Sequence, residues 1–274
     1  MPPEPFSQPR AFLEESETLH ALLASRPESD LLLVTQFKGW TIEDVLAHLH
    51  LFNLAAGMSL RDASSLRTFF ADLRRAREGG RSLREVTLDY LGPLRGRALL
   101  DQWRSDCDAI AQAFEAVDPR MRVAWGGPDM SARSSISARL METWAHGQAV
   151  FDRLGADRVD ADRIRNVAVL GVNTFAWTFR NRGLEVPETA PHVLLEAPSG
   201  ARWEWNAEVE SDRIEGSATE FCQVVAQTRA WEDTGLRVVG ENARRWLSIA
   251  QCFAGPPEDP PRPGSRHRAS VARG

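Results

Sequence analysis

Apolar residues recur at helical spacing through the first two thirds of the chain, and this pattern predicts a series of amphipathic helices. Residues 11–24 form the first of them. The second is expected over residues 41–60, where Thr41 and Asp44 occupy the positions of a capping box. The remaining helical segments are predicted over residues 83–116, with an interruption at Gly92-Pro93, over 131–154 and over 161–182.

The pattern changes beyond Gly183. Period-two alternation on both sides of the turn at 198–200 predicts a β-hairpin over residues 192–206. We expect a third strand over 208–214 and helices over 217–231, again opened by a capping box, and 241–254. The sequence therefore predicts a mainly α protein in which a helical bundle (8–183) precedes a small α+β domain (190–254) and a disordered tail (255–274) rich in Pro, Arg and Ser.

The composition of the chain limits the classes of partner that the protein is expected to bind. The 274 residues carry a net charge of -5 with both signs interspersed, which argues against a nucleic-acid or membrane partner. The three cysteines form no C-x-x-C pair, and no secretory signal pattern follows Met1, so we expect a reduced, cytoplasmic protein. Hydrophobic residues make up 43% of the chain, enough for a real core. A small molecule is the expected ligand.

The most informative stretch lies in the helix predicted over 131–154. Glu142 and His146 are four residues apart, so they lie one turn apart on the same helix face. Alanines surround them on that face. Such a face either is exposed to solvent or lines a polar pocket. For a single helix considered alone, a Glu and His pair exposed to solvent is the more common case.

His48 makes a polar site the better interpretation, because this histidine lies on the predicted helix over 41–60 at the edge of an apolar stripe. His48, Glu142 and His146 together are a candidate three-ligand metal site. Three N/O ligands leave coordination positions open, as in catalytic zinc sites, and the same donors suit Ni or Fe(II). An open metal can activate a bound water or thiol and polarise a carbonyl, which is the chemistry of an enzyme.

Other candidates have simpler explanations. Asp44 can orient His48, but its capping position already accounts for it. Arg229 can bind a carboxylate, or it is a surface arginine beside acidic neighbours. The sequence places no second residue at a spacing that would form a catalytic or metal-binding motif with the remaining histidines or with Cys222. No nucleophile elbow, phosphate-binding loop or Rossmann fingerprint is present.

Two segments, WTIEDVLAHL (40–49) and ARLMETWAHGQ (138–148), resemble the mycothiol-dependent maleylpyruvate isomerase family of the DinB-like superfamily, and the likeness continues through IAQCFAGPP (249–257). The resemblance implies a DinB-like four-helix bundle that holds a divalent metal, usually zinc, through His48, Glu142 and His146. It also implies a thiolate of mycothiol bound at that metal and an assisting arginine, which we match to Arg229.

Two positions depart from the family pattern. Relatives usually carry Asp where this chain has Ala149, and often paired arginines where it has Thr228-Arg229. The leading hypothesis is a metal-dependent enzyme that activates mycothiol for S-transfer to, or isomerisation of, a small electrophile. The alternatives are a thiol-independent metal-dependent hydrolase, lyase or cyclase of a specialised pathway, and a non-catalytic metal or small-molecule binding module.

Overall fold

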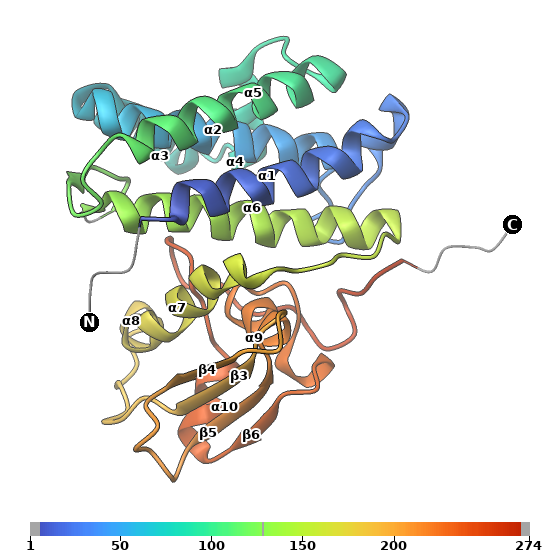
Figure 1. Ribbon diagram of the computed structural model, residues 1–274. Coiled ribbons are helices and arrows are strands. Elements are labelled where there is room, and N and C mark those ends of the chain that lie inside the picture. Colours follow the sequence, from blue (N-terminus) through green and yellow to red (C-terminus); the bar gives the residue numbers. More distant parts are fainter. Residues whose placement is uncertain (1–5, 128, 270–274) are drawn as a thin grey trace, which may run out of the picture. The chain divides into compact units, whose positions relative to one another are not determined.

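The computed structural model describes residues 6–127 and 129–269. It divides into two compact units, Met1–Val150 and Phe151–Gly274 (Figure 1). The first unit is helical, and the second combines helices with a small sheet. This agrees with the mainly α fold, followed by a smaller α+β region, that the sequence predicts.

Unit 1 contains a bundle of four long helices. They are α1 (Gln8–Ala24), α2 (Ile42–Arg61), α5 (Gly96–Glu115) and α6 (Ala132–Leu154), the last of which continues into the second unit (Figure 1). Shorter elements connect them: the 3-10 helix η1 (Glu28–Leu32), the helices α3 (Ala63–Glu78) and α4 (Leu83–Leu91), and the two-residue strands β1 (Arg122–Val123) and β2 (Met130–Ser131). The long helices match the sequence prediction closely, α1 starting three residues earlier than expected.

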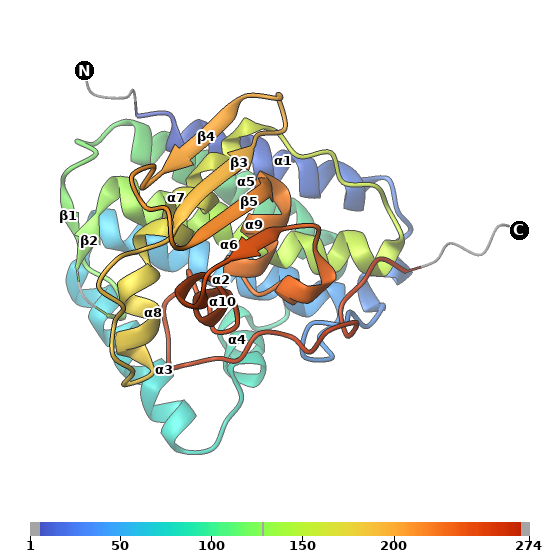
Figure 2. The ribbon, with the colours of Figure 1, turned by 90° about the horizontal axis from the view of Figure 1, so that it is seen from below.

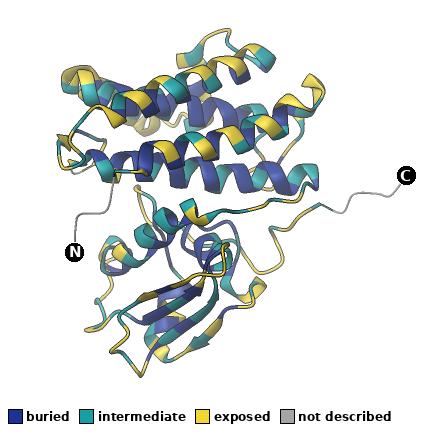
Figure 3. Ribbon diagram, viewed as in Figure 1, coloured by how far each residue is buried: buried dark blue, intermediate teal, exposed yellow. Residues whose placement is uncertain are grey.

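The bundle is held together by apolar helix faces that point inward (Figure 3). Large side chains fill its centre with almost no exposure to solvent, among them Phe12, Trp103, Phe114 and Trp144. Burying such side chains is the main stabilising contribution to a bundle, at roughly 1.5–3 kcal/mol each. The rigid packing that results fixes the polar side chains placed among these residues.

Helix α2 begins with the capping box that the sequence predicts. The Asp44 backbone N–H donates to Thr41 Oγ1 at 3.1 Å, and the Thr41 backbone N–H donates to Asp44 Oδ2 at 2.9 Å. Arg84 on α4 adds an ion pair to the same carboxylate at 2.8 Å. Asp44 is therefore a capping residue, as its position indicated, and it fixes the residue at which the helix carrying His48 starts.

Carboxylates from other elements cap helix α5, which has no capping side chain of its own. The Gly96 backbone N–H donates to Glu43 Oε2 at 2.6 Å, and the Arg97 backbone N–H donates to Glu28 Oε1 at 2.9 Å. Negative charge at a helix N-terminus is favourable because the first N–H groups are otherwise unpaired. Since Glu43 lies on α2, this contact also fixes α2 against α5.

Unit 2 is built around a four-stranded sheet with the order β4-β3-β5-β6. Strand β3 (His192–Glu196) pairs antiparallel with β4 (Arg202–Trp205) and parallel with β5 (Arg213–Ser217), while β6 (Arg237–Val239) pairs antiparallel with β5. Helix α9 (Ala218–Val225) lies against β3 and β5 (Figure 2). The unit also contains α7 (Arg165–Asn173), α8 (Phe175–Asn181), α10 (Glu241–Leu247) and the 3-10 helices η2 (Asp162–Ile164) and η3 (Trp231–Asp233).

The structure corrects several predicted elements of unit 2. The single helix expected over 161–182 is divided at Thr174, whose hydroxyl bonds the Leu170 and Gly171 carbonyls. The helix expected over 217–231 ends at Val225. Its predicted capping box does not form, because the Glu220 carboxylate accepts from the Gly235 backbone N–H instead. The third strand lies at 213–217 rather than 208–214, the helix expected over 241–254 ends at Leu247, and β6 was not anticipated.

The division of the chain also differs from the prediction. The compact units meet at residues 150 and 151, not near 183, because α7 packs on α9 and so belongs to unit 2. The expected disorder over 255–274 does not hold for residues 255–269. Other groups of unit 2 supply hydrogen-bond partners to this segment: the Gly264 N–H donates to the Asp233 carboxylate, and Arg268 Nε donates to the Gly155 carbonyl. Residues 270–274 lie outside the described part of the chain.

Two further findings concern the described residues. None of their helices combines the length and apolarity required to span a bilayer. Cys107, Cys222 and Cys252 are buried thiols, and none of them forms a disulfide with another described residue. Burial raises the pKa of Cys107 to about 12, so this thiol is a weakly polar core group rather than a nucleophile.

Replacing Asp44 by Ala removes the cap of α2 and the partner of Arg84, and we expect the free energy of unfolding at pH 7 to fall by about 1–2 kcal/mol. Burial alone would raise the pKa of Asp44, but hydrogen bonds from Arg84 and Thr41 outweigh it and lower that pKa. The contribution is therefore complete above the unfolded-state pKa of about 3.9 and is lost as the pH falls through the lower folded-state pKa.

Urea denaturation of the parent protein and of Asp44→Ala, at pH values between 7 and about 3, checks this prediction. The difference between their free energies of unfolding should become smaller as the pH falls. The matched control is Glu85→Ala, which removes the exposed capping box of α4. It should cost less than Asp44→Ala. A constant difference across this pH range would contradict the role assigned to the Asp44 carboxylate.

Candidate metal centre

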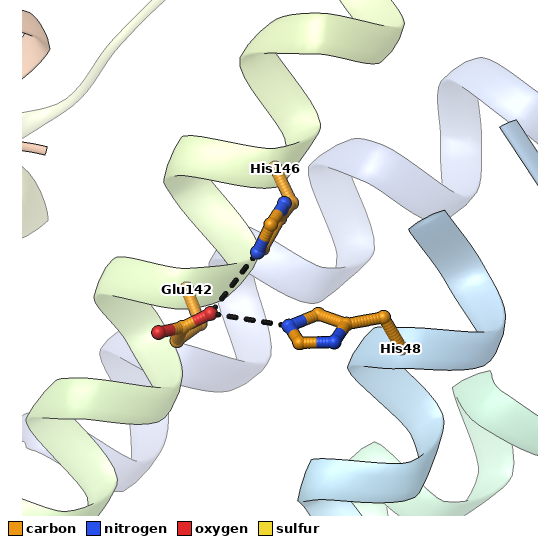
Figure 4. A group of neighbouring side chains, drawn as sticks. All are labelled: His48, Glu142 and His146. Atoms are coloured by element: carbon orange, nitrogen blue, oxygen red, sulfur yellow. Dashed lines mark hydrogen bonds and ion pairs between the residues drawn. The ribbon is translucent and has the colours of Figure 1, made fainter. Parts of the chain in front are cut away.

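The three residues proposed from the sequence as metal ligands, His48, Glu142 and His146, come together inside unit 1 (Figure 4). One carboxylate oxygen, Glu142 Oε2, lies 3.1 Å from His146 Nε2 and 3.4 Å from His48 Nε2. Helix α6 supplies Glu142 and His146 from successive turns, and α2 supplies His48. The alternative of a solvated pair on one helix is excluded, because the three side chains are only 10–23% exposed.

The donor set fits a divalent metal. Two ligand atoms at about 2.0–2.2 Å from a tetrahedral zinc ion are roughly 3.3–3.6 Å apart. The two oxygen–nitrogen distances at Glu142 are close to that spacing, and one ligand atom from each of the three residues lies within 4.8 Å of the others. Two imidazoles and a carboxylate, without a cysteine, are typical of catalytic zinc sites and also bind Fe(II) and Ni.

The electrostatics of the site favour the ligand forms of these groups. Burial alone would raise the pKa of Glu142, but hydrogen bonds from His146 and His48, together with the charges of His146 and Arg139, hold it well below its ordinary value. Burial lowers the pKa of His48 to about 4, against the opposing effect of Glu142. At neutral pH the site therefore holds an ionised carboxylate and a neutral His48 imidazole, the forms that bind a metal.

Two aromatic rings from the segment before α2 cover the histidines. The Trp40 ring lies nearly parallel to His146, with centroids 6.5 Å apart, and meets His48 at 5.5 Å. Phe37 meets His146 edge-on at 4.8 Å. A tight turn at Lys38 and Gly39, both with positive φ, brings the two rings together. The Phe37 and Trp40 rings form an aromatic wall beside the two histidines. The sequence analysis did not predict this wall, since the only signal for it was that the two residues shortly precede the capping box of α2.

A buried arginine accompanies the ligands. Arg139 is 2% exposed and lies one turn before Glu142 on α6. Its Nε donates to Asn53 Oδ1 at 3.0 Å, and its Nη2 donates to the Leu49 carbonyl at 3.5 Å. Sequence reasoning missed Arg139, because a single arginine in an amphipathic helix is usually exposed.

Arg229 lies in unit 2 and has a carboxylate partner there. Its two terminal nitrogens donate to the two Asp152 oxygens, each at 2.7 Å, and Nη1 also donates to the Thr228 carbonyl. Both side chains of the ion pair are largely buried, at 13% and 6% exposure. These contacts give Arg229 a structural role within unit 2. The catalytic role expected from the family resemblance stays a prediction.

The histidines set aside on sequence grounds have other environments. His50 is buried, with Nδ1 3.6 Å from Asp106 Oδ2, and His192 Nε2 lies 2.9 Å from Glu204 Oε1 on the neighbouring strand. Among the described residues, His48, Glu142 and His146 are the one group of three or more His, Cys, Asp or Glu side chains with convergent ligand atoms. They are therefore the candidate site.

The fold and this site define a helical-bundle protein with a two-histidine, one-carboxylate centre. Residues 12–151 match the sequence model of the mycothiol maleylpyruvate isomerase N-terminal domain, and this range includes α2, most of α6 and all three candidate ligands. Since the match spans half of the chain, the protein belongs to this family.

Two relatives and two solved structures match most of the chain. Uncharacterized proteins from two strains of Mycobacterium tuberculosis, CDC 1551 and H37Rv, are each 38% identical over 244 residues, which is 89% of this chain and 93% of theirs. The crystal structure of the mycothiol-dependent maleylpyruvate isomerase matches with a TM-score of 0.56 and 14% identity, over 85% of this chain and 92% of that one. A histidine-to-alanine mutant of that enzyme matches equally well. At this identity the likeness to the solved structures concerns the fold.

Arg229→Gln removes the bidentate partner of a buried carboxylate, and we expect the free energy of unfolding to fall by about 3 kcal/mol. Urea denaturation measures this, with the exposed Arg202→Gln as the control that should change little. Adding Asp152→Asn to Arg229→Gln should recover part of the loss, because a buried carboxylate that has lost its bidentate partner is then removed. An Arg229 variant as stable as the parent protein would show that the ion pair is not structural.

Proposed function

We propose that the protein is a metal-dependent enzyme that uses a low-molecular-weight thiol, mycothiol, for isomerisation of, or S-transfer to, a small electrophilic substrate. Membership of the mycothiol maleylpyruvate isomerase family supports the thiol and the isomerase class. The observation that carries the proposal is the placement of Glu142 Oε2 between the two imidazole nitrogens in a buried site.

His48, Glu142 and His146 would hold the metal, which we expect to be zinc, with Ni or Fe as alternatives. When bound, a divalent metal with an open position lowers the pKa of a coordinated thiol, so that the nucleophilic thiolate is present at neutral pH. The ionised Glu142 and the neutral His48 require no proton loss before they bind it.

The wall of Phe37 and Trp40 would exclude water from one side of the centre. An environment poor in water strengthens the attraction between a thiolate and the positive charge beside it.

The thiolate sulfur then forms a bond to an electrophilic carbon conjugated to a carbonyl, and the electron pair of the C=C bond moves toward that carbonyl. In isomerisation, rotation about the resulting single bond precedes re-formation of the double bond and expulsion of the thiolate. In S-transfer, the adduct takes up a proton and keeps the sulfur.

One residue favours a second candidate function. Ala149 follows His146 by one turn of α6 and is half-buried, and it offers no polar group where the family resemblance implies an Asp. If that Asp serves thiol binding, a chain with Ala149 retains the metal without the thiol. The protein would then be a hydrolase, lyase or cyclase in which the metal polarises a carbonyl.

The metal assignment predicts one equivalent of a divalent metal in the purified protein, measured by elemental analysis after extensive dialysis. His146→Ala and Glu142→Ala should each lower the occupancy at least about tenfold, because two ligands hold a divalent ion far more weakly than three. His20→Ala, on the half-buried side of α1, is the matched histidine control and should keep full occupancy. Full metal content in His146→Ala would refute the ligand set.

The thiol assignment predicts a spectroscopic change. Titrating mycothiol into the Co(II)-substituted protein should produce intense thiolate-to-cobalt charge-transfer absorption in the near ultraviolet. A methylated mycothiol, which cannot form a thiolate, serves as the control ligand and should give none. Charge transfer that is absent from the native chain but present in Ala149→Asp would favour the thiol-independent function.

A further inference from the structure

Arg139 is a buried charge that the proposed mechanism does not use. It is 2% exposed, and its hydrogen bonds in the described part of the chain go to two neutral oxygens, Asn53 Oδ1 and the Leu49 carbonyl. Its guanidinium also lies over the Phe52 ring, 6.0 Å from the centroid. Burial lowers the pKa of Arg139, although the nearby charge of Glu142 acts in the opposite direction. A cation so placed is costly unless it serves a specific arrangement.

The partners of Arg139 all belong to one short segment of α2. Leu49, Phe52 and Asn53 occupy the turn that follows His48, and the Phe52 ring itself lies 4.8 Å from the His48 ring. Arg139 is on α6, one turn before Glu142. It therefore joins the two helices at the level where their metal-ligand side chains meet.

We infer that Arg139 is a positioning residue for the metal centre: by its bonds to Asn53 and to the Leu49 carbonyl it fixes α2 against α6, so that His48 meets Glu142. The inference rests on the metal site of the proposed function. A planar guanidinium suits this task because its donors have fixed directions and can bond two acceptors at once. Asn53 is itself oriented, since its Nδ2 donates to Cys107 Sγ on α5 at 3.4 Å.

A positioning role of Arg139 can be distinguished from a simple effect of its charge, because the two predict opposite changes in metal affinity when Arg139 is replaced. A cation near a divalent metal repels it, so if charge were the whole effect, removing Arg139 would tighten metal binding. If Arg139 positions the helices, its removal weakens metal binding. Asn53→Leu separates the two further, because it removes the acceptor and keeps the charge.

The test measures Co(II) affinity by competition with a chelator, together with the visible absorption of bound Co(II), in the full chain. Arg139→Met and Asn53→Leu should each weaken binding by about tenfold or more and shift the cobalt bands, as the loss of supporting contacts does in other metal sites. Arg139→Lys, which keeps the charge but not the two fixed donor directions, should give an intermediate affinity. Ser135→Ala, a buried polar change one turn earlier on α6, is the control and should leave both readouts unchanged.

Urea denaturation of the metal-free variants reports stability separately, since a merely structural role would lower stability and leave the cobalt spectrum of the folded fraction unchanged. The inference is overturned if Arg139→Met binds Co(II) as well as or better than the parent and Asn53→Leu matches the parent. Should Arg139→Met fail to fold, Asn53→Leu and Arg139→Lys decide the question. If the parent chain binds no metal, the proposed function itself fails, whereas unchanged variants of a metal-binding parent refute only the role of Arg139.

Discussion

The contact between Glu142 and the two imidazoles is the interaction on which the candidate site depends. An ionised carboxylate inside a helical bundle is unfavourable unless several groups compensate its charge. Here hydrogen bonds with His146, on the next turn of the same helix, and with His48 on α2 stabilise it, and Arg139 adds a positive charge from the preceding turn. The surrounding apolar packing of the bundle leaves each of these groups little freedom to move.

The bundle and the segment before α2 contribute differently to the site. The bundle determines which atoms converge, through the fixed start of α2 at Thr41 and the bond between Glu43 and the first turn of α5. The segment carrying Phe37 and Trp40 determines what surrounds those atoms. An aromatic surface beside a polar centre lowers the local dielectric response, so each charge there acts more strongly than it would in water. Family membership and fold place the protein among the mycothiol maleylpyruvate isomerase relatives, but the reaction is determined by this local environment.

Local signals in the sequence predicted local features well. The capping box at Thr41 and Asp44 was predicted correctly because its bonds span three residues, and the long helices of unit 1 because their apolar stripes extend over many turns. The same reasoning was wrong at Ser217, where a residue from beyond the helix, Gly235, takes the Glu220 carboxylate. Arg139 and Phe37 could not be predicted, since their roles depend on which helix or turn packs against them. The convergence of His48 with Glu142 was a hypothesis that the two helical patterns suggested and the family resemblance strengthened, because no short-range rule joins two helices so far apart in the chain.

That separation has a consequence for how the protein is made. Glu142 and His146 form a pair as soon as α6 is helical, but His48 is 94 residues from Glu142 and reaches it only when α2 and α6 have packed. Contacts between distant parts of a chain form after the local ones, because a large loop must close first. A nascent chain emerging from the ribosome therefore presents at most two of the three donors. The complete set becomes available only to the folded bundle, so metal acquisition would follow folding rather than guide it.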